Sequence, residues 1–164
     1  MSEVDFRFIA YKAFTNGMLF HRASQRCSEQ RQITGEKYEM LVQPAIVSLA
    51  FAVELYLKAI ILKGSGKPGR GHDLKELFGT IPSPDRADIL AKFVEIDLGE
   101  HDFQAELSDA ALTFNSWRYA HEVISISSRI IFLSRFAHAL LRHGEGVIDG
   151  DFGGLNVRLR QLPP

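Results

Sequence analysis

The feature that most constrains this chain is a long apolar segment, AIVSLAFAVELYLKAIILK, at residues 45–63. Wound as a helix, the segment is apolar almost all the way round, which is typical of a central helix that is covered on several sides. Each large apolar side chain left in water would cost about 1.5–3 kcal/mol, so the rest of the chain has to wrap this segment. The sequence therefore predicts a fold built around residues 45–63 as an interior helix.

The same segment carries two charged residues, Glu54 and Lys58, near its middle. A charged side chain at the centre of a membrane-spanning helix costs about 2.5–3.5 kcal/mol, so we expect a buried core helix and no membrane interaction. Glu54 and Lys58 are four residues apart and share a face of the helix. Because a buried charge needs a partner, two interpretations stay open. Glu54 forms a structural ion pair, or it builds a polar pocket with Arg118 or His72.

The remaining helices are predicted from apolar periodicity and from their start and stop residues. Residues 28–37 are polar and contain a glycine, so they are expected to form an irregular connector. We expect an all-α bundle of about five or six helices, at approximately residues 2–26, 73–78, 83–98, 103–117 and 125–143, with a further helix that begins between Tyr38 and Pro44 and ends at residue 63. The aromatic residues on these helices are expected in the core, namely Phe14, Phe20, Phe51, Phe114, Trp117 and Phe136.

Length and composition restrict the class of protein. With 164 residues, 46% of them hydrophobic and 24% charged, the chain is long and apolar enough for one folded domain rather than a disordered segment. Cys27 is the only cysteine, which excludes an intramolecular disulfide and suits a cytoplasmic protein. The six histidines do not have the spacing of metal ligands, so neither a metal nor another cofactor is expected. The net charge of −1 means that any contact with nucleic acid must use a local patch.

Such a patch is predicted between residues 63 and 75, the most cationic stretch of the chain. Lys67, Arg70 and His72 lie here among four glycines, whose backbone amides can approach an anion closely. Two interpretations stay open, a loop that binds phosphate or the RNA backbone and a solvated loop that leads into the next helix. Glu54, Lys58, Lys67, Arg70 and His72 are the predicted ligand-binding residues.

Composition changes after residue 143. The last 21 residues, GEGVIDGDFGGLNVRLRQLPP, contain five glycines and end in two prolines. We therefore predict a helical domain at residues 1–143 and a Gly/Pro-rich tail at residues 144–164.

Three segments in a fixed order carry a resemblance to a known family. They are AFAVELYLKAIIL, then GHDLKELF after a glycine-rich loop, then FNSWRYAHE before the last helix. Together they resemble the HEPN superfamily of helical RNA- and nucleotide-associated domains, over approximately residues 5–143. The resemblance implies a helical bundle that forms a homodimer through the faces of its long helices.

Nuclease members of the superfamily carry an Arg followed, after four to six residues, by a His, and cleave RNA without a metal. In this chain only two residues separate Arg118 from His121, and the local pattern resembles a branch with an Arg-Tyr-x-x-Glu motif that ends at Glu122. Arg118, His121 and Glu122 are the predicted catalytic residues, because an Arg can hold a phosphate and a His can transfer a proton near neutral pH. The alternative is that Arg118 and Glu122 form a structural pair.

The resemblance implies a module that binds RNA or a nucleotide, or a partner nucleotidyltransferase, in a bacterial defence or toxin–antitoxin setting. One alternative is a metal-independent endoribonuclease that uses Arg118 and His121. Another is a non-catalytic scaffold whose tail recruits a partner.

Overall fold

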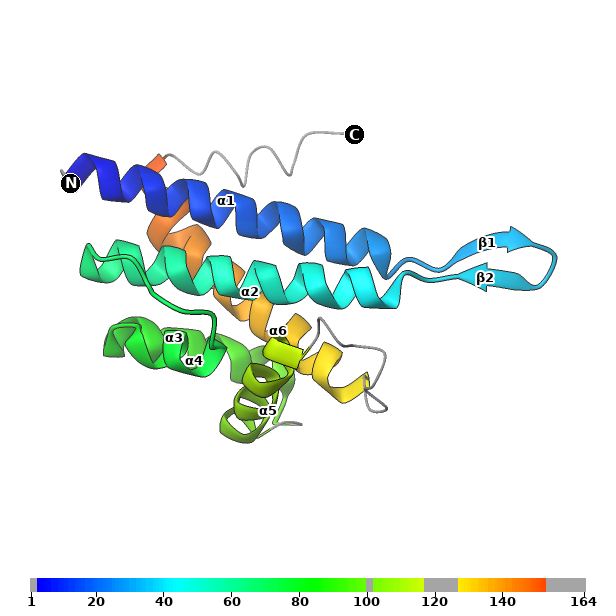
Figure 1. The fold of residues 1–164 in the computed structure, drawn as a ribbon. Helices are drawn as coiled ribbons and strands as arrows, with labels where there is room; N and C mark the ends of the chain where they lie inside the picture. Colours follow the sequence, from blue (N-terminus) through cyan, green and yellow to red (C-terminus); the bar gives the residue numbers. More distant parts are fainter. Residues whose placement is uncertain (1–2, 100–101, 117–126, 153–164) are drawn as a thin grey trace.

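Two long antiparallel helices, α1 (Glu3–Cys27) and α2 (Val42–Ser65), form one side of the molecule in a computed structural model that describes residues 3–99, 102–116 and 127–152 (Figure 1). A short hairpin of β1 (Arg31–Thr34) and β2 (Lys37–Glu39) joins them. The chain continues through α3 (Leu74–Thr80), α4 (Ser83–Asp97), α5 (Phe103–Ser116) and α6 (Ser127–Gly144). The predicted all-α bundle is confirmed.

Helix α2 is the interior element that the sequence predicts. It packs against α1 on one side and against α3 and α6 on the others, and Tyr56, Leu57 and Ala59 are completely buried. By length and composition alone α2 could cross a membrane, but 72% of its most apolar stretch is buried inside the protein itself. The apolar surface of α2 is therefore used by the bundle.

Local signals fix the ends of the shorter helices. The Asp73 carboxylate accepts hydrogen bonds from the backbone amides of Lys75 and Glu76, both at 2.9 Å, and so caps α3 as expected. Pro84 occupies the first turn of α4, where its missing N–H costs nothing. The last helix is followed directly by a π-helical turn (Glu145–Asp149) and a 3₁₀ turn (Gly150–Phe152), and Ile148 of the first turn is buried in the core. Residues 153–164 of the predicted tail lie outside the described part.

The prediction of an irregular connector at residues 28–37 is wrong in part, because β1 and β2 form an antiparallel hairpin there. Gly35 has a φ of 53°, which turns the chain between the two strands. The strands are only four and three residues long. A segment this short shows almost no period-two alternation, and for that reason the sequence pattern did not reveal it.

The prediction that the helix aromatics are core residues is confirmed for Phe14 and Phe136 and is wrong for Phe20 and Phe51. Phe20 and Phe51 remain 41% and 42% exposed, and their rings stack on each other with centroids 5.6 Å apart. They bridge α1 and α2 on a side of this helix pair that is half open to solvent. The side chains of Phe114 and Trp117 lie outside the described part of the chain.

The close crossing of α1 and α2 generates a first prediction. A Cβ at Gly17 would lie 2.8 Å from the ring of the fully buried Tyr56 and 3.3 Å from the Ala52 carbonyl oxygen. Gly17→Ala should therefore lower the free energy of unfolding by about 1–3 kcal/mol, because the two helices must separate to accept the methyl group. Urea denaturation measures this.

The matched control is Gly79→Ala in α3, where nothing beyond its chain neighbours and the backbone of its own helix lies within 4 Å of the added Cβ in the described structure. This variant should be neutral or more stable by up to about 1 kcal/mol. Equal unfolding midpoints for the two variants would show that α1 and α2 do not approach each other as closely as described.

Candidate functional site

The buried charge on α2, Glu54, is the centre of a small polar cluster. Its side chain is only 6% exposed. Oε1 of Glu54 accepts a hydrogen bond from Nζ of Lys58 at 2.7 Å, one turn further along the same helix, and lies 2.9 Å from Nδ1 of His72. His72 comes from the loop that follows α2. The structure thus brings together three of the predicted ligand-binding residues.

The contact with Glu54 orients the His72 ring. A carboxylate only accepts hydrogen bonds, so Nδ1 of His72 carries the hydrogen that it donates to Oε1. The side chain of His72 is 67% exposed. Its other ring nitrogen, Nε2, therefore remains available to a ligand.

The second carboxylate oxygen of Glu54 is unusual. Oε2 is shielded from solvent and has no hydrogen-bond partner among the described residues. Leaving a buried acceptor unsatisfied costs about 1–3 kcal/mol. An unsatisfied buried acceptor calls for an explanation, so Glu54 is a candidate for a functional role in addition to its structural one.

The loop of residues 66–72 is held close against α2. A Cβ at Gly69 would lie 3.0 Å from Cδ1 of Ile61 and 3.2 Å from Cδ2 of Leu77, so only a glycine allows this approach without displacing its neighbours. Gly66 and Gly71 have φ values of 67° and 81°, which side chains rarely adopt. These glycines let the backbone of the loop lie on the bundle and place His72 over Glu54.

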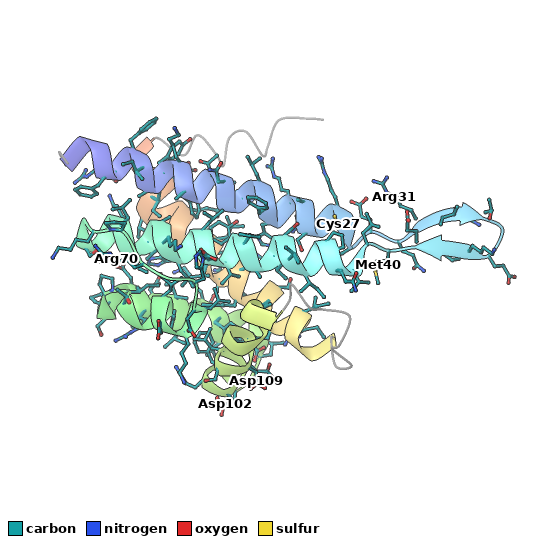
Figure 2. The ribbon with its side chains drawn as sticks, viewed as in Figure 1. Cys27, Arg31, Met40, Arg70, Asp102 and Asp109 are labelled. Carbon is teal, nitrogen blue, oxygen red and sulfur yellow. The ribbon has the colours of Figure 1, made fainter. Side chains whose placement is uncertain are left out.

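The cations of this region divide into paired and unpaired side chains. Lys58 pairs with Glu54, and Lys63 pairs with Asp151. Lys67 and Arg70 are exposed and contact no carboxylate in the described part of the chain. Figure 2 shows Arg70 beside the C-terminal half of α2. The unpaired positive charge of the loop is therefore concentrated at Lys67 and Arg70.

The predicted catalytic residues Arg118, His121 and Glu122 lie outside the described residues. The contact that the sequence suggested between Glu54 and Arg118 therefore lies outside the described residues, whereas the structure shows both an ion pair of Glu54 with Lys58 and a contact with His72. Lys67 and Arg70 lie on the same loop as His72 but do not contact Glu54 in the described structure.

A second polar cluster, at the contact between α4 and α6, was not predicted. Nδ1 of His143 lies 2.6 Å from Oδ2 of Asp88, and its Nε2 lies 3.5 Å from Oδ1 of Asp85. The hydrogen bond from His143, followed by that from Lys92, lowers the pKa of Asp88 below its ordinary value. The side chain of His143 is only 2% exposed, so this cluster ties the two helices together and does not present its imidazole to a ligand.

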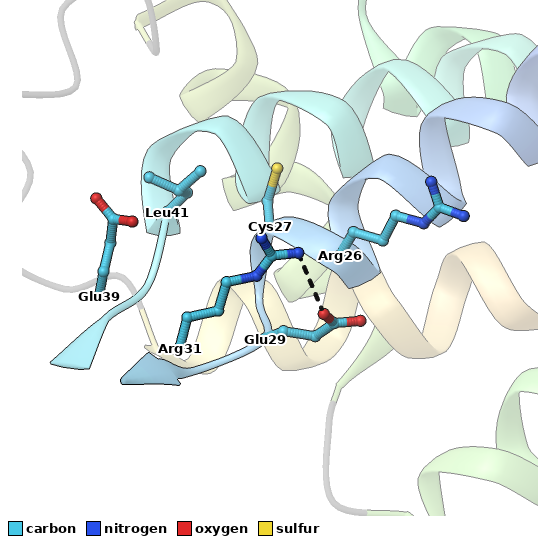
Figure 3. A pocket seen from close by; sticks show the side chains of 6 residues that line it. All are labelled: Arg26, Cys27, Glu29, Arg31, Glu39 and Leu41. Atoms are coloured by element: carbon cyan, nitrogen blue, oxygen red, sulfur yellow. Dashed lines mark ion pairs between the residues drawn. The ribbon is translucent and has the colours of Figure 1, made fainter. Parts of the chain in front are cut away.

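A hollow of about 180 Å³ lies at the base of the hairpin (Figure 3). Its lining is mixed in charge, with two arginines and two glutamates, and consists of Arg26, Cys27, Glu29, Arg31, Glu39 and Leu41. Within the described ranges no three His, Cys, Asp or Glu side chains form a group that could hold a metal ion. Because the charges that line this hollow are mixed, it is a weaker candidate for binding an anion than the Glu54 cluster and the cationic loop above it.

The burial of Glu54 leads to a second prediction. Glu54→Ala should lower the free energy of unfolding by about 2 kcal/mol, equivalent to roughly 4–8 °C in Tm, because it leaves a cavity and removes the partner of Lys58 and His72. Thermal melting followed by circular dichroism measures the change.

Glu95→Ala is the matched control, because Glu95 pairs with Arg142 at 3.0 Å on the surface and its side chain is 61% exposed. Exposed pairs contribute about 0–1 kcal/mol, so this variant should melt within about 2 °C of the wild type. Equal Tm values for Glu54→Ala and the wild type would contradict the buried position of Glu54.

Comparison with known proteins agrees with this architecture. The family model described as the HEPN domain matches residues 19–135, which is more than half of the chain. The matched range includes α2, the Glu54 cluster and the cationic loop. No curated protein and no solved structure matches the chain. The chain belongs to the HEPN family.

Proposed function

We propose that this HEPN domain binds RNA or a nucleotide through phosphate groups at the loop of residues 66–72. The observation that carries the proposal is the pair of exposed cations, Lys67 and Arg70, beside a histidine that a buried carboxylate holds in place. HEPN domains are generally associated with RNA or nucleotides, so the family supports the same class of ligand.

The charges favour a phosphate ligand. The net charge of the chain is −1, so the protein as a whole does not attract an anion strongly. At the loop, however, Lys67 and Arg70 have no carboxylate partner in the described structure, and an Arg can hold two phosphate oxygens at once. Binding at this site would therefore depend on a few local contacts and would weaken as salt increases.

Glu54 contributes by organising the loop. Its bond to His72 fixes the end of the loop to α2, and its bond to Lys58 pairs the buried carboxylate with a cation of the same helix. A loop that is ordered before binding loses less conformational entropy when it binds a ligand. The buried carboxylate of Glu54 would therefore serve to order the loop before the ligand binds.

A third prediction tests the loop. Fluorescence anisotropy with a labelled single-stranded RNA, repeated at several salt concentrations, should show log K falling linearly with log salt concentration. Lys67→Ala/Arg70→Ala should reduce the magnitude of this slope by about 1.4, since each phosphate contact to a single strand contributes about 0.7.

The matched control is Lys12→Ala/Arg26→Ala, which removes the same charge from exposed positions on α1. The control should keep the wild-type slope and affinity. Equal losses in the two double variants would mean that the RNA responds to net charge and would contradict a site at the loop. A labelled nucleotide in the same assay distinguishes the two ligands.

A second candidate function, metal-independent RNA cleavage, is favoured by the Glu54–His72 pair. A carboxylate that orients an imidazole with its second nitrogen exposed is an arrangement suited to a general base. Nε2 of His72 would take the proton of a 2′-hydroxyl, whose oxygen then attacks the adjacent phosphorus. The bond from phosphorus to the 5′-oxygen of the next nucleotide breaks, and this oxygen takes a proton from water and leaves as a hydroxyl. Arg118 and His121 remain the alternative catalytic pair.

The fourth prediction separates these possibilities by incubating RNA with the protein in EDTA. If the loop is catalytic, His72→Ala should abolish cleavage and Arg118→Ala should retain it, because the imidazole is the base. The reverse result would assign catalysis to Arg118 and His121. No cleavage by the wild type would leave binding as the function, and the anisotropy assay would still test it.

The partner is also a proposal. We propose a nucleotidyltransferase as the partner protein, in a cytoplasmic defence or toxin–antitoxin system, because the resemblance to the HEPN superfamily implies such a setting. A pure scaffold would differ from both functions above, because its activity would depend on residues 144–164 and not on the cationic loop.

A further inference from the structure

The hairpin between α1 and α2 is fully exposed. All seven residues of β1 and β2 are open to solvent, including Ile33 at 59% and Tyr38 at 56%. Figure 1 shows the hairpin extending beyond the adjoining ends of the two long helices. Tyr38 lies opposite Gln32. The register is irregular between Gln32 and Thr34, so Ile33 is an extra residue of β1 that is paired with no residue of β2.

Such a hairpin needs a partner for two physical reasons. A two-stranded sheet without a core is marginally stable at best in water. Its outer edges also present unpaired N–H and C=O groups, which form a template for another strand. Extending the sheet at an edge supplies the missing hydrogen bonds directly.

The charge order on β2 identifies the strand that fits. Its three residues are Lys37, Tyr38 and Glu39. If a second β2 pairs antiparallel about a two-fold axis at Tyr38, each Lys37 lies opposite the other copy's Glu39, and the two tyrosines lie opposite each other. Opposite charges and aromatic pairs at facing positions stabilise a sheet, whereas like charges destabilise it. The strand is thus complementary to itself.

We propose that a second copy of this chain docks on the hairpin, edge to edge through β2, to form a four-stranded sheet. In this sheet Glu39 lies between Arg31, its neighbour within the hairpin, and Lys37 of the other copy. The β1 edge lacks this property, because a two-fold axis through the middle of Arg31–Thr34 places Arg31 opposite Thr34. The proposal goes beyond the proposed function and does not depend on the cationic loop. It places the contact between copies at the hairpin and not at the long-helix faces that the family resemblance implies.

The fifth prediction uses charge reversal on β2. Lys37→Glu gives a strand with two acids and Glu39→Lys a strand with two lysines, so each variant meets like charges at both facing positions. We expect each to raise the dimer Kd by about tenfold or more. Equimolar mixing should restore association as a heterodimer, and the swapped variant Lys37→Glu/Glu39→Lys should dimerise like the wild type. Sedimentation velocity measures all four.

Lys12→Glu is the matched control, because it makes the same charge change on α1, away from the hairpin, and should leave the dimer intact. Mixing also separates a lost dimer contact from damage within one hairpin, since Glu39→Lys places a lysine opposite Arg31. The proposal is overturned if the wild type is monomeric up to its solubility limit. It is also overturned if the single reversals leave the dimer Kd unchanged, which is the result expected of a dimer that forms through the Phe20–Phe51 side. Failure of the mixed variants to associate would overturn it as well.

Discussion

The burial of most of the apolar surface of α2 is the constraint on which the rest of this structure depends. Its apolar surface can leave water only if several helices surround it, so α1, α3 and α6 take their positions from it. Because α2 is interior, the carboxylate of Glu54 is interior too, and it must find donors within its reach. Lys58 on the same helix and His72 on the following loop provide them. The candidate site is therefore a consequence of how the core is built.

The same arrangement decides which polar groups stay available at the surface. Lys58 and Lys63 are neutralised by Glu54 and Asp151, and this leaves Lys67 and Arg70 as the exposed cations of the loop. Net charge gives no indication of this division, which arises from distances between side chains. At the other end of the helix pair, the hairpin carries a charge order that fits a second copy of itself. A ligand site and a proposed contact between copies thus lie on separate parts of one domain.

Much of the fold could be predicted because the signals are local. The apolar run located α2, and an aspartate followed three residues later by a glutamate located the capped start of α3. The hairpin was missed because strands of four and three residues are too short to show a period. The contact of His143 with Asp88 joins residues 55 positions apart, and no local pattern indicates such a pair. The exposure of Phe20 and Phe51 was also missed, because composition does not show which side of a helix pair stays open.

By itself the sequence determined that residues 45–63 form an interior helix, that Glu54 and Lys58 share one of its faces, and that the loop beyond it is cationic. These conclusions follow from periodicity and from the cost of burying a charge. Only the tertiary structure decided that His72 is the second partner of Glu54, that Gly69 brings the loop onto α2, and that Asp151 neutralises Lys63. The physical reason is that hydrogen bonds and ion pairs depend on distances through space, and folding sets these distances between residues that are far apart in the chain.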